Sequence, residues 1–561
     1  MTAASSRPQV RKTMSAQQDS PDRFDVVIVG AGFAGLYMLH RVRALGLTAR
    51  IVERGEDVGG TWYWNRYPGA RCDIESIDYA YSFDETLTRE WRWTERYAAQ
   101  PEILSYIGHV ADRFDLRDDI TFGTTVRRAD WDDDTAQWTL VCDTGQVLRA
   151  TFCVMATGCL SVAKQPEFPG LSQFRGRWYH TGRWPHDPVD FTGRRVAVIG
   201  TGSSGIQAIP RIAEAAEQLF VLQRTPNYSM PAQNRPLAAD EFDSAIADFA
   251  TRRRICQRSD AGVPHPPPTQ GTFDVTAEER ERRYEEGWQR GGINALSAAF
   301  TDFFTDEDAN RMAQEFARNK IRSIVEDAQT AELLCPQHHI GTKRTCVDTG
   351  YFQTYNRDNV ELVNSRAEPI DQITATGIRL VGGRHLDVDT LVFAIGFDAI
   401  TGALTDIDIR GTGGAALRDE WDDGPRTLLG LQTAGFPNLF MVTGPGSPSV
   451  LSNMLVSIEQ HVDWIADCLL HLRKLGHDRI EATRDAQDRW MEHIGELAAE
   501  TLYPQANSWY LGANIPGKAR TFMPYVAGCG EYRRECDEVV ASGYSGFLLG
   551  RPSPVREGTS A

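Results

Sequence analysis

The sequence predicts an α/β protein with two Rossmann-like dinucleotide-binding domains and an inserted helical region. Residues 30–35 (GAGFAG) follow the apolar run DVVIV, and residues 200–205 (GTGSSG) follow VAVI. A buried parallel strand that runs into G-x-G-x-x-G and then into a helix is typical of a nucleotide-binding unit. The change to long, charged helical stretches after about residue 231 predicts the insert.

The bulk composition limits the possible functions. A chain of 561 residues is too long for one hydrophobic core and indicates two or three domains. The net charge of −17 disfavours nucleic acid and anionic membranes as partners, because both attract basic surfaces. The ten cysteines show neither a C-x-x-C pair nor metal-ligand spacing, and no apolar run has the length of a membrane span. We therefore expect a cytoplasmic protein that is a monomer.

The two glycine units differ in the charge that follows them. Glu53 lies 23 residues after Gly30, where an acid holds the ribose hydroxyls. A carboxylate there would repel a 2′-phosphate, so the first site should bind FAD or NAD. Arg224 lies 24 residues after Gly200, and its planar fork of donors suits a 2′-phosphate. The second nucleotide should therefore be NADP.

The remaining patterns divide the chain. Alternating segments from about 120 to 154 predict a β-meander, and the strand, Gly/Pro/Ser loop and helix start over 436–454 predict a helix N-terminus at a flavin edge. We expect the first nucleotide domain over 24–159 and 398–550, the second over 160–230 and 335–397, and the helical insert over 231–334. Residues 1–23 and 551–561 are expected to be a disordered leader and tail. The charge runs of the insert should face solvent.

Two segments between these units carry unusual residues. Residues 59–73 are rich in glycine and aromatic side chains, which predicts a loop packed against a flat ligand, with a turn in the core as the alternative. Asp73, within this apolar loop, needs a cationic partner. Lys343 and Arg344 are two adjacent cations after Gly341-Thr342, and we expect this turn to lie near the second nucleotide.

The segment between the two glycine motifs contains a specific fingerprint. F-x-G-x-x-x-H-x-x-x-W-P is matched by Phe174, Gly176, His180, Trp184 and Pro185. With the GTKR turn and GPGSPSVLSNM, it makes the chain resemble the type I Baeyer-Villiger monooxygenases, above all those that act on phenylacetone and on steroids. The likeness extends from about residue 25 to 550 and is weakest in the insert. It implies an NADPH-dependent flavoprotein monooxygenase that uses O2 to convert ketones into esters or lactones.

The resemblance also implies binding residues. FAD would contact Gly30, Gly32, Ala34, Gly35, Glu53, Thr61, Trp62, Tyr63, Trp64, Asp73, Tyr79, Val126 and Met454. NADP would contact Arg71, Cys72, Asp73, Gly200, Thr201, Gly202, Ser203, Ser204, Gly205, Ile206, Gln223, Arg224, Lys343, Arg344 and Trp509. The ketone pocket would be lined by Pro448, Ser449, Val450 and Leu451.

Roles follow for a few of these residues. Arg344 matches the catalytic arginine of the family, which would stabilise a C4a-peroxyflavin anion, and Asp73 would orient it. Lys343 and Arg224 would bind the 2′-phosphate. We interpret His180 and Trp184 as coupling domain movement rather than as acid–base groups. The chain departs from the family at Ile395, usually Thr, and at Thr345-Cys346-Val347, which leaves the shape of the pocket open.

Three alternatives remain. A flavin-containing monooxygenase that oxidises amine nitrogen or sulfide sulfur shares both glycine motifs, but lacks the Trp184-Pro185 ending and a counterpart of Arg344. A nucleotide-disulfide reductase would need a redox cysteine pair in the first half of the flavin domain, which is absent from the sequence. A catalytically idle flavoprotein that binds a partner would have no use for a charge-stabilising cation.

Overall fold

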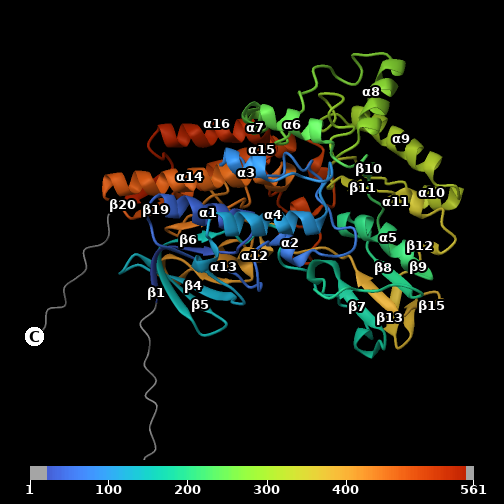
Figure 1. The fold of residues 1–561 in the computed structure, drawn as a ribbon, viewed down its shortest axis with the longest axis horizontal. Coiled ribbons are helices and arrows are strands. Elements are labelled where there is room, and N and C mark those ends of the chain that lie inside the picture. Colours follow the sequence, from blue (N-terminus) through green and yellow to red (C-terminus); the bar gives the residue numbers. More distant parts are fainter. Residues whose placement is uncertain (1–21, 551–561) are drawn as a thin grey trace, which may run out of the picture.

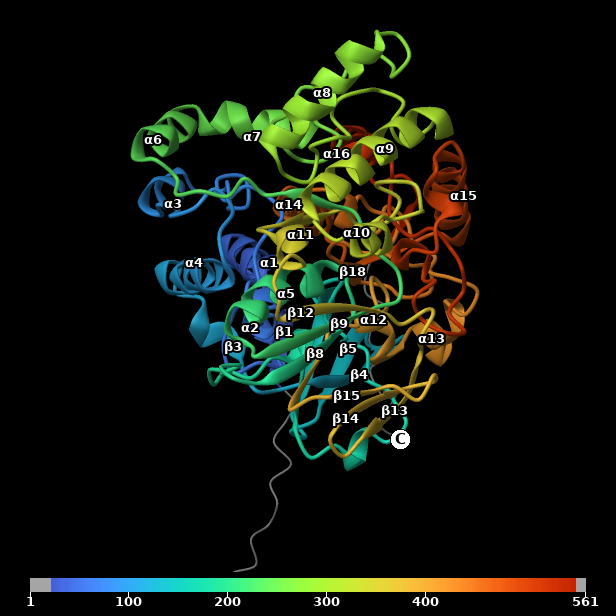
Figure 2. The ribbon, with the colours of Figure 1, turned by 90° about the vertical axis from the view of Figure 1, so that its right-hand side faces the viewer.

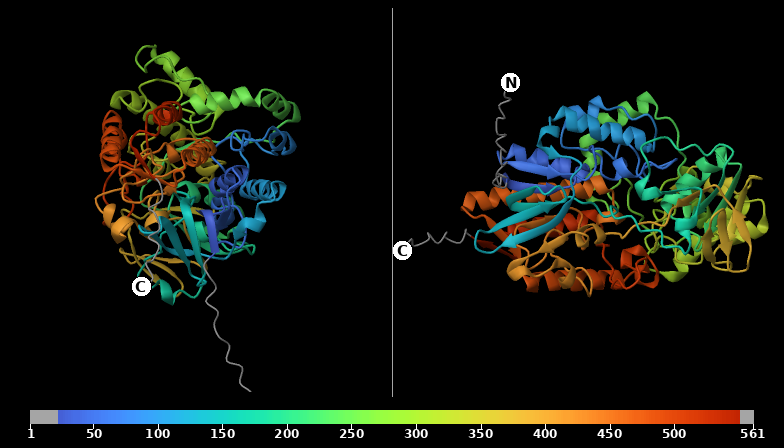
Figure 3. Two further views of the ribbon diagram at one scale, coloured as in Figure 1. Left: turned by 90° about the vertical axis from the view of Figure 1, so that its left-hand side faces the viewer. Right: turned by 90° about the horizontal axis from the view of Figure 1, so that it is seen from below.

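The computed structural model describes residues 22–550, and its two largest sheets lie at opposite ends of the long axis (Figure 1; Figure 3, right). The expected tail and residues 1–21 of the expected leader lie outside the described residues. Asp22 and Arg23, which we had placed in the leader, instead belong to the first strand, because they pair with Leu148 and Arg149. Among residues 22–550, no helix combines the length and apolar character needed to cross a bilayer.

The first sheet has eight strands in the order β17-β4-β5-β6-β1-β2-β3, with β18 also paired to β6. The strand β1 is parallel to β2 and β6, with Val26 opposite Ala49 and Phe152, whereas β4, β5 and β6 form the expected antiparallel meander. Residues 120–121 are not part of that meander: they form β3, parallel to β2. The strands are β1 (Asp22–Val29), β2 (Ala49–Val52), β3 (Ile120–Thr121), β4 (Val126–Asp132), β5 (Gln137–Cys142), β6 (Val147–Met155), β17 (Asp408–Arg410) and β18 (Leu439–Met441).

One face of this sheet is covered by helices from both ends of the chain. The helix α1 (Phe33–Ala44) packs between the sheet and α14 (Met454–Leu475), so it is apolar on most of its surface. The hydroxyl of Tyr37 on α1 donates to Asp463 on α14 at 2.7 Å. The other helices of this domain are α2 (Thr61–Trp64), α3 (Glu85–Glu90), α4 (Gln100–Arg113), α15 (Arg484–Ala499) and α16 (Gly528–Ala541), with the hairpin β19 (Arg479–Ala482) and β20 (Phe547–Gly550). The short helices α12 (Gly402–Thr405) and α13 (Leu417–Glu420) pack against the opposite face of the sheet.

The second sheet is entirely parallel, in the order β12-β9-β8-β16-β7. The fingerprint segment supplies its edge strand β7, and Gly176 is required there because a β-carbon would lie 2.3 Å from the carbonyl oxygen of Asp389. The elements are β7 (Arg177–His180), β8 (Arg195–Ile199), α5 (Ser203–Ala215), β9 (Gln218–Gln223), α11 (Tyr351–Thr354), β12 (Val360–Asn364) and β16 (Thr390–Phe393), with a small sheet of β13 (Ile370–Thr374), β14 (Gly377–Leu380) and β15 (His385–Asp387). Together the two sheets confirm the predicted fold class.

The insert lies across one side of the molecule, over α14 and α16 (Figure 2). The stretch 239–258 forms two helices, because the backbone of Asp248 leaves the helical region. The hydrophobic core of the insert has its own aromatic side chains, including Tyr284, Phe300 and Phe316. Its helices are α6 (Ala239–Ala247), α7 (Phe249–Arg258), α8 (Ala277–Arg290), α9 (Glu307–Ile324) and α10 (Ala328–Leu334), and strands β10 (Ser229–Pro231) and β11 (Cys346–Asp348) close it.

A buried ion pair joins the insert to the first domain. The guanidinium of Arg253 on α7 lies 2.8 Å from the carboxylate of Glu459 on α14, and both side chains are almost fully buried. Arg253 also donates to the carbonyl oxygens of Asp78 and Ala80. Removing one partner of such a pair leaves a buried, uncompensated charge.

The substitution Arg253→Met should therefore lower the free energy of unfolding by about 3 to 5 kcal/mol. Calorimetry or denaturant titration of the FAD-loaded protein would measure it. The control is Arg254→Met, since Arg254 is exposed on the same helix and donates only to Thr251. Equal stability of the two variants would contradict the role given to Arg253.

Candidate functional site

The two glycine motifs lie at the carboxyl ends of strands β1 and β8, where open α/β sheets bind ligands. Gly30 has φ of +105°, and a β-carbon there would lie 2.6 Å from the carbonyl oxygen of Ala156. A β-carbon on Gly35 would lie 1.8 Å from the carbonyl oxygen of Gly30. These contacts press the turn against the sheet and direct the N-terminus of α1 at the space above it, which suits a pyrophosphate.

Glu53 stands beside this turn at the end of β2. Its side chain is buried, and its two carboxylate oxygens accept hydrogen bonds from the backbone N–H groups of Ala31 and Gly55, each at 2.7 Å. The carboxylate is thus fixed in orientation next to the first glycine motif. This geometry supports a site for ribose hydroxyls and argues against a site for a 2′-phosphate.

The aromatic segment differs from the predicted loop. Residues 61–64 form the helical turn α2, and the structure buries Trp62 and Tyr63 in it. The indole N–H of Trp62 donates to the hydroxyl of Tyr79 at 3.2 Å, and Arg54 lies over the ring of Trp64. The other residues predicted to contact FAD lie at the ends of elements around the same sheet edge: Gly32 at the N-cap of α1, Ala34 in its first turn, Val126 at the start of β4 and Met454 at the start of α14.

The second glycine motif repeats the first geometry. Gly200 has φ of +111°, and β-carbons on Gly200 and Gly205 would each lie 2.3 Å from a backbone oxygen. At Gly202, by contrast, nothing lies within 4 Å of a β-carbon position, so this backbone is open to a ligand. Thr201, Ser203, Ser204 and Ile206 flank it at the start of α5. The residues present fit a second pyrophosphate.

Cations gather beside this second motif. Burial, then Arg224 and Arg366, lower the pKa of Lys343. Burial and Arg224 also lower the pKa of Lys164. A group of neighbouring cations, in which the arginines lower the pKa values of the two lysines, suits an anion such as a 2′-phosphate. The sequence analysis had missed Lys164 and Arg366; the signal for Arg366 was its place just after β12, as Arg224 follows β9.

Three residues predicted to contact NADP have other partners in the structure. Gln223 is buried and donates to the carbonyl oxygen of Leu333 at 2.8 Å, while its side-chain oxygen has no partner among residues 22–550. Arg71 is 2.5 Å from a carboxylate oxygen of Glu95. Cys72 is buried, and burial raises the pKa of its thiol. Trp509, by contrast, lies in a short 3-10 turn and is only half-buried, against Tyr510.

Arg344 and Asp73 meet between the two glycine motifs. A guanidinium nitrogen of Arg344 lies 3.5 Å from the Asp73 carboxylate, and its other nitrogen donates to the carbonyl oxygen of Val450 at 2.8 Å. Burial raises the pKa of Asp73 and Arg344 opposes this rise. Burial lowers the pKa of Arg344, but Asp73 and Tyr510 more than offset it, so the net shift is upward. The guanidinium therefore stays charged.

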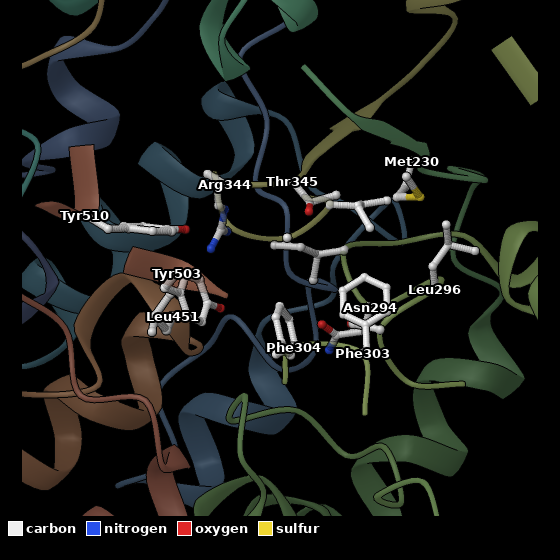
Figure 4. A pocket seen from close by; sticks show the side chains of 14 residues that line it. Met230, Asn294, Leu296, Phe303, Phe304, Arg344, Thr345, Leu451, Tyr503 and Tyr510 are labelled. Atoms are coloured by element: carbon white, nitrogen blue, oxygen red, sulfur yellow. The ribbon is translucent and has the colours of Figure 1, made fainter. Parts of the chain in front are cut away.

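A cavity of about 490 Å³, including its open mouth, extends from Arg344 (Figure 4). In Figure 4, Arg344 and Tyr510 lie on one side, and Asn294, Leu296 and Met230 on the other. Of the four predicted pocket residues only Leu451 lines this cavity; Pro448, Ser449 and Val450 are buried behind it. Gly341, from the GTKR turn, and Thr345, a departure from the family pattern, also line it. The remaining lining residues were missed because they come from distant, non-motif segments: Ile293, Ser297, Phe303, Phe304, Ile340 and Tyr503.

The fingerprint histidine is buried at the end of β7. Its ring Nδ1 accepts the N–H of Gly182 at 2.9 Å. Burial, followed by Arg183, lowers the pKa of His180 to about 4, so the ring is neutral near pH 7. Trp184 is buried in the core of the second domain. These contacts fit a structural role for the fingerprint.

Comparison with known proteins places the chain in a family. Residues 23–235 match a family model described as flavin-binding monooxygenase-like. An acetone monooxygenase (methyl acetate-forming) of Gordonia sp. (strain TY-5) is 40% identical over 532 residues, which cover 94% of this chain and 100% of that one. This chain belongs to the Baeyer-Villiger monooxygenases. The predicted family is thereby confirmed.

Two more relatives bear on cofactor and chemistry. The structure of an oxidized steroid monooxygenase bound to NADP has a TM-score of 0.91 and 53% identity, covering 94% of this chain and 100% of that one. A phenazine N-monooxygenase of Lysobacter antibioticus is 39% identical over 535 residues, covering 94% of this chain and 97% of that one. This monooxygenase is an NADPH-dependent flavoprotein enzyme with FAD and NADP as cofactors, which confirms both predicted cofactors.

The cation group yields a cofactor prediction. Arg224→Ala and Lys343→Ala should each raise the KM for NADPH by at least about 10-fold, because a hydrogen bond between two charged groups is lost. The KM for NADH should change by less than about twofold, since NADH lacks the 2′-phosphate. Arg366→Ala should act in the same direction. Steady-state kinetics with both cofactors measures this.

Arg379→Ala provides the control, because Arg379 pairs with Asp371 in the small β13–β15 sheet. Equal losses with NADPH and NADH would argue against a 2′-phosphate site.

His180 yields a pH prediction. Its folded pKa of about 4 lies below its ordinary 6.5, so it contributes stability above pH 6.5 that is lost as the pH falls toward 4. The free energy of unfolding of the wild type, relative to His180→Gln, should fall by up to about 3 kcal/mol over this window. Thermal unfolding of both proteins across the pH range measures the difference; a constant difference would refute the burial of a neutral ring.

Proposed function

We propose that this enzyme inserts one atom of O2 beside the carbonyl group of a ketone and so forms an ester or a lactone. The second oxygen atom leaves as water, with two electrons from NADPH and a proton. The observation that carries the proposal is Arg344, a largely buried cation that Asp73 holds at one end of a cavity. The ketone-oxidising relatives support it.

The cofactors define what the protein must do. FAD, when bound, would accept two electrons from NADPH and activate O2. We assign its binding to the first glycine motif, with Glu53 for the ribose hydroxyls, and the binding of NADP to the second motif, with Arg224 and Lys343 for the 2′-phosphate. The fixed carboxylate of Glu53 and the cation group support this order of sites.

Arg344 is proposed to stabilise negative charge on the reacting oxygen. A fixed cation in a desolvated site does this at little reorganisation cost, and one well-placed donor is worth roughly 3 to 4 kcal/mol in comparable sites. Asp73 and the carbonyl of Val450 hold the guanidinium from two directions. Tyr510 lies on the same side of the cavity (Figure 4), and its pKa is raised by burial to about 12, so it remains a neutral hydroxyl.

The cavity is proposed to bind the ketone. Phe303, Phe304 and Leu296 give it an apolar wall, which would favour a carbon skeleton over water. Exclusion of water strengthens the field of Arg344 at the carbonyl group. Thr345, one of the departures from the family pattern, lines the cavity, which agrees with an altered pocket shape. We further propose that the enzyme acts as a cytoplasmic monomer.

Oxidation of nitrogen is the second candidate, because the phenazine N-monooxygenase is nearly as similar as the ketone-oxidising relatives. Incubation of the yellow protein with NADPH, air and a panel of phenylacetone, cyclohexanone, progesterone, a thioether and an aromatic N-heterocycle separates the two. Esters or lactones support the first proposal. N-oxide or sulfoxide without any ester supports the second.

Arg344 can be tested directly. Arg344→Ala should lower the rate of ester formation by about 100-fold or more, because the reacting oxygen loses its cation. Arg344→Lys keeps the charge but not the planar fork of donors, so its rate of ester formation should fall by less. Arg211→Ala is the matched control, since Arg211 is an exposed arginine on α5. Gas chromatography measures the product, and stopped-flow spectroscopy measures reduction by NADPH. Ester formation at the normal rate in an FAD-bound Arg344→Ala protein would contradict the charge-stabilising role of Arg344.

A further inference from the structure

Asn294 is the one carboxamide among the cavity-lining residues. Its side chain extends toward the cavity from the wall opposite Arg344 and Tyr510 (Figure 4). Across residues 22–550 its amide has no hydrogen-bond partner; only its backbone oxygen is used, by the N–H of Ala298. An amide with two donors and an acceptor therefore faces a space whose neighbouring walls are Leu296, Phe303 and Phe304.

The backbone that carries Asn294 is tightly held. A β-carbon on Gly292 would lie 2.5 Å from the hydroxyl oxygen of Tyr97, and one on Gly287 would lie 1.8 Å from the carbonyl oxygen of Ala295. The N–H of Gly292 donates to the carbonyl oxygen of Pro231 at 2.9 Å. These contacts pack the backbone beside Asn294 closely against its neighbours at the cavity wall. A ligand that fills the cavity must therefore desolvate this amide.

Desolvation of an amide without a new partner costs free energy, so the cavity penalises a purely hydrocarbon skeleton that covers Asn294. A skeleton with a hydroxyl or carbonyl oxygen at that place recovers the hydrogen bond. We infer that Asn294 is a specificity-determining residue that selects ketones bearing a second oxygen remote from the reacting carbonyl. This inference rests on the proposed ketone oxidation. It narrows the substrate class to bifunctional ketones whose two oxygens span the cavity.

The test uses two matched series of methyl ketones of increasing chain length, one ending in a methyl group and one in a hydroxyl. For the wild type, the ratio of kcat/KM values, hydroxylated over unsubstituted, should rise to a maximum at one chain length. In Asn294→Leu that maximum should fall by at least about 10-fold, because a site that pairs a hydroxyl discriminates strongly. Asn319→Leu, at the exposed outer face of α9, should leave it unchanged.

Each other outcome overturns the inference in its own way. An unchanged maximum in Asn294→Leu removes Asn294 from recognition. An equal loss for every ketone with a raised KM for NADPH would assign Asn294 to the cofactor. No ester from any ketone with the wild type would overturn the proposed function together with this inference.

A second variant covers the case in which Asn294→Leu does not fold, as judged by its FAD absorbance and Tm. Asn294→Asp keeps the size and the acceptors but loses the N–H donors. It should retain the preference for the hydroxylated series. For a third series, which ends in a second acetyl group, its kcat/KM should fall by at least about 10-fold. Equal effects on both series would refute recognition by the amide.

Discussion

The pairing of Arg344 with Asp73 is the constraint on which the site depends. Moving two charges out of water costs several kcal/mol per ion, and only good geometry with further hydrogen bonds offsets it. Asp73 comes from the segment after α2 in the first domain, while Arg344 lies between the insert and β11. Gln207 on α5 of the second domain also approaches Asp73, at 3.5 Å. The pair can therefore form only when all three parts of the chain are packed together.

Charge is arranged differently around the two glycine motifs. The first nucleotide motif has a fixed carboxylate at Glu53, and the second has cations at Arg224, Lys343, Arg366 and Lys164. The two glycine motifs thus differ in the sign of the neighbouring charge and not in their turns, since both turns have the same geometry. Arg344 stays charged, and Asp73 and the carbonyl oxygen of Val450 hold its guanidinium in orientation.

The insert has a larger part in the site than its charged helices indicated. Its outer faces are solvated, as expected, but the turn between α8 and α9 forms one wall of the cavity. The ion pair of Arg253 and Glu459 fixes the insert to α14, whose start lies next to the Leu451 side of the cavity. The shape of the cavity therefore depends on packing between segments that are more than 150 residues apart, so substrate preference can change without any change in the nucleotide motifs.

The sequence by itself determined the fold class and the preference of the second site for NADP, because each depends on local patterns: an apolar strand that meets a glycine turn, or a charge at a set distance after it. FAD and the role of Arg344 followed from the resemblance to the family. Tertiary structure alone decided the rest. The helical turn at 61–64 and the break at Asp248 are seen only in the folded chain. Lys164 and Asn294 belong to no motif, and only the folding of distant segments onto one another places Lys164 near Arg224 and Asn294 in the cavity wall. Long-range contacts decide such positions, and no local pattern in a single sequence encodes them.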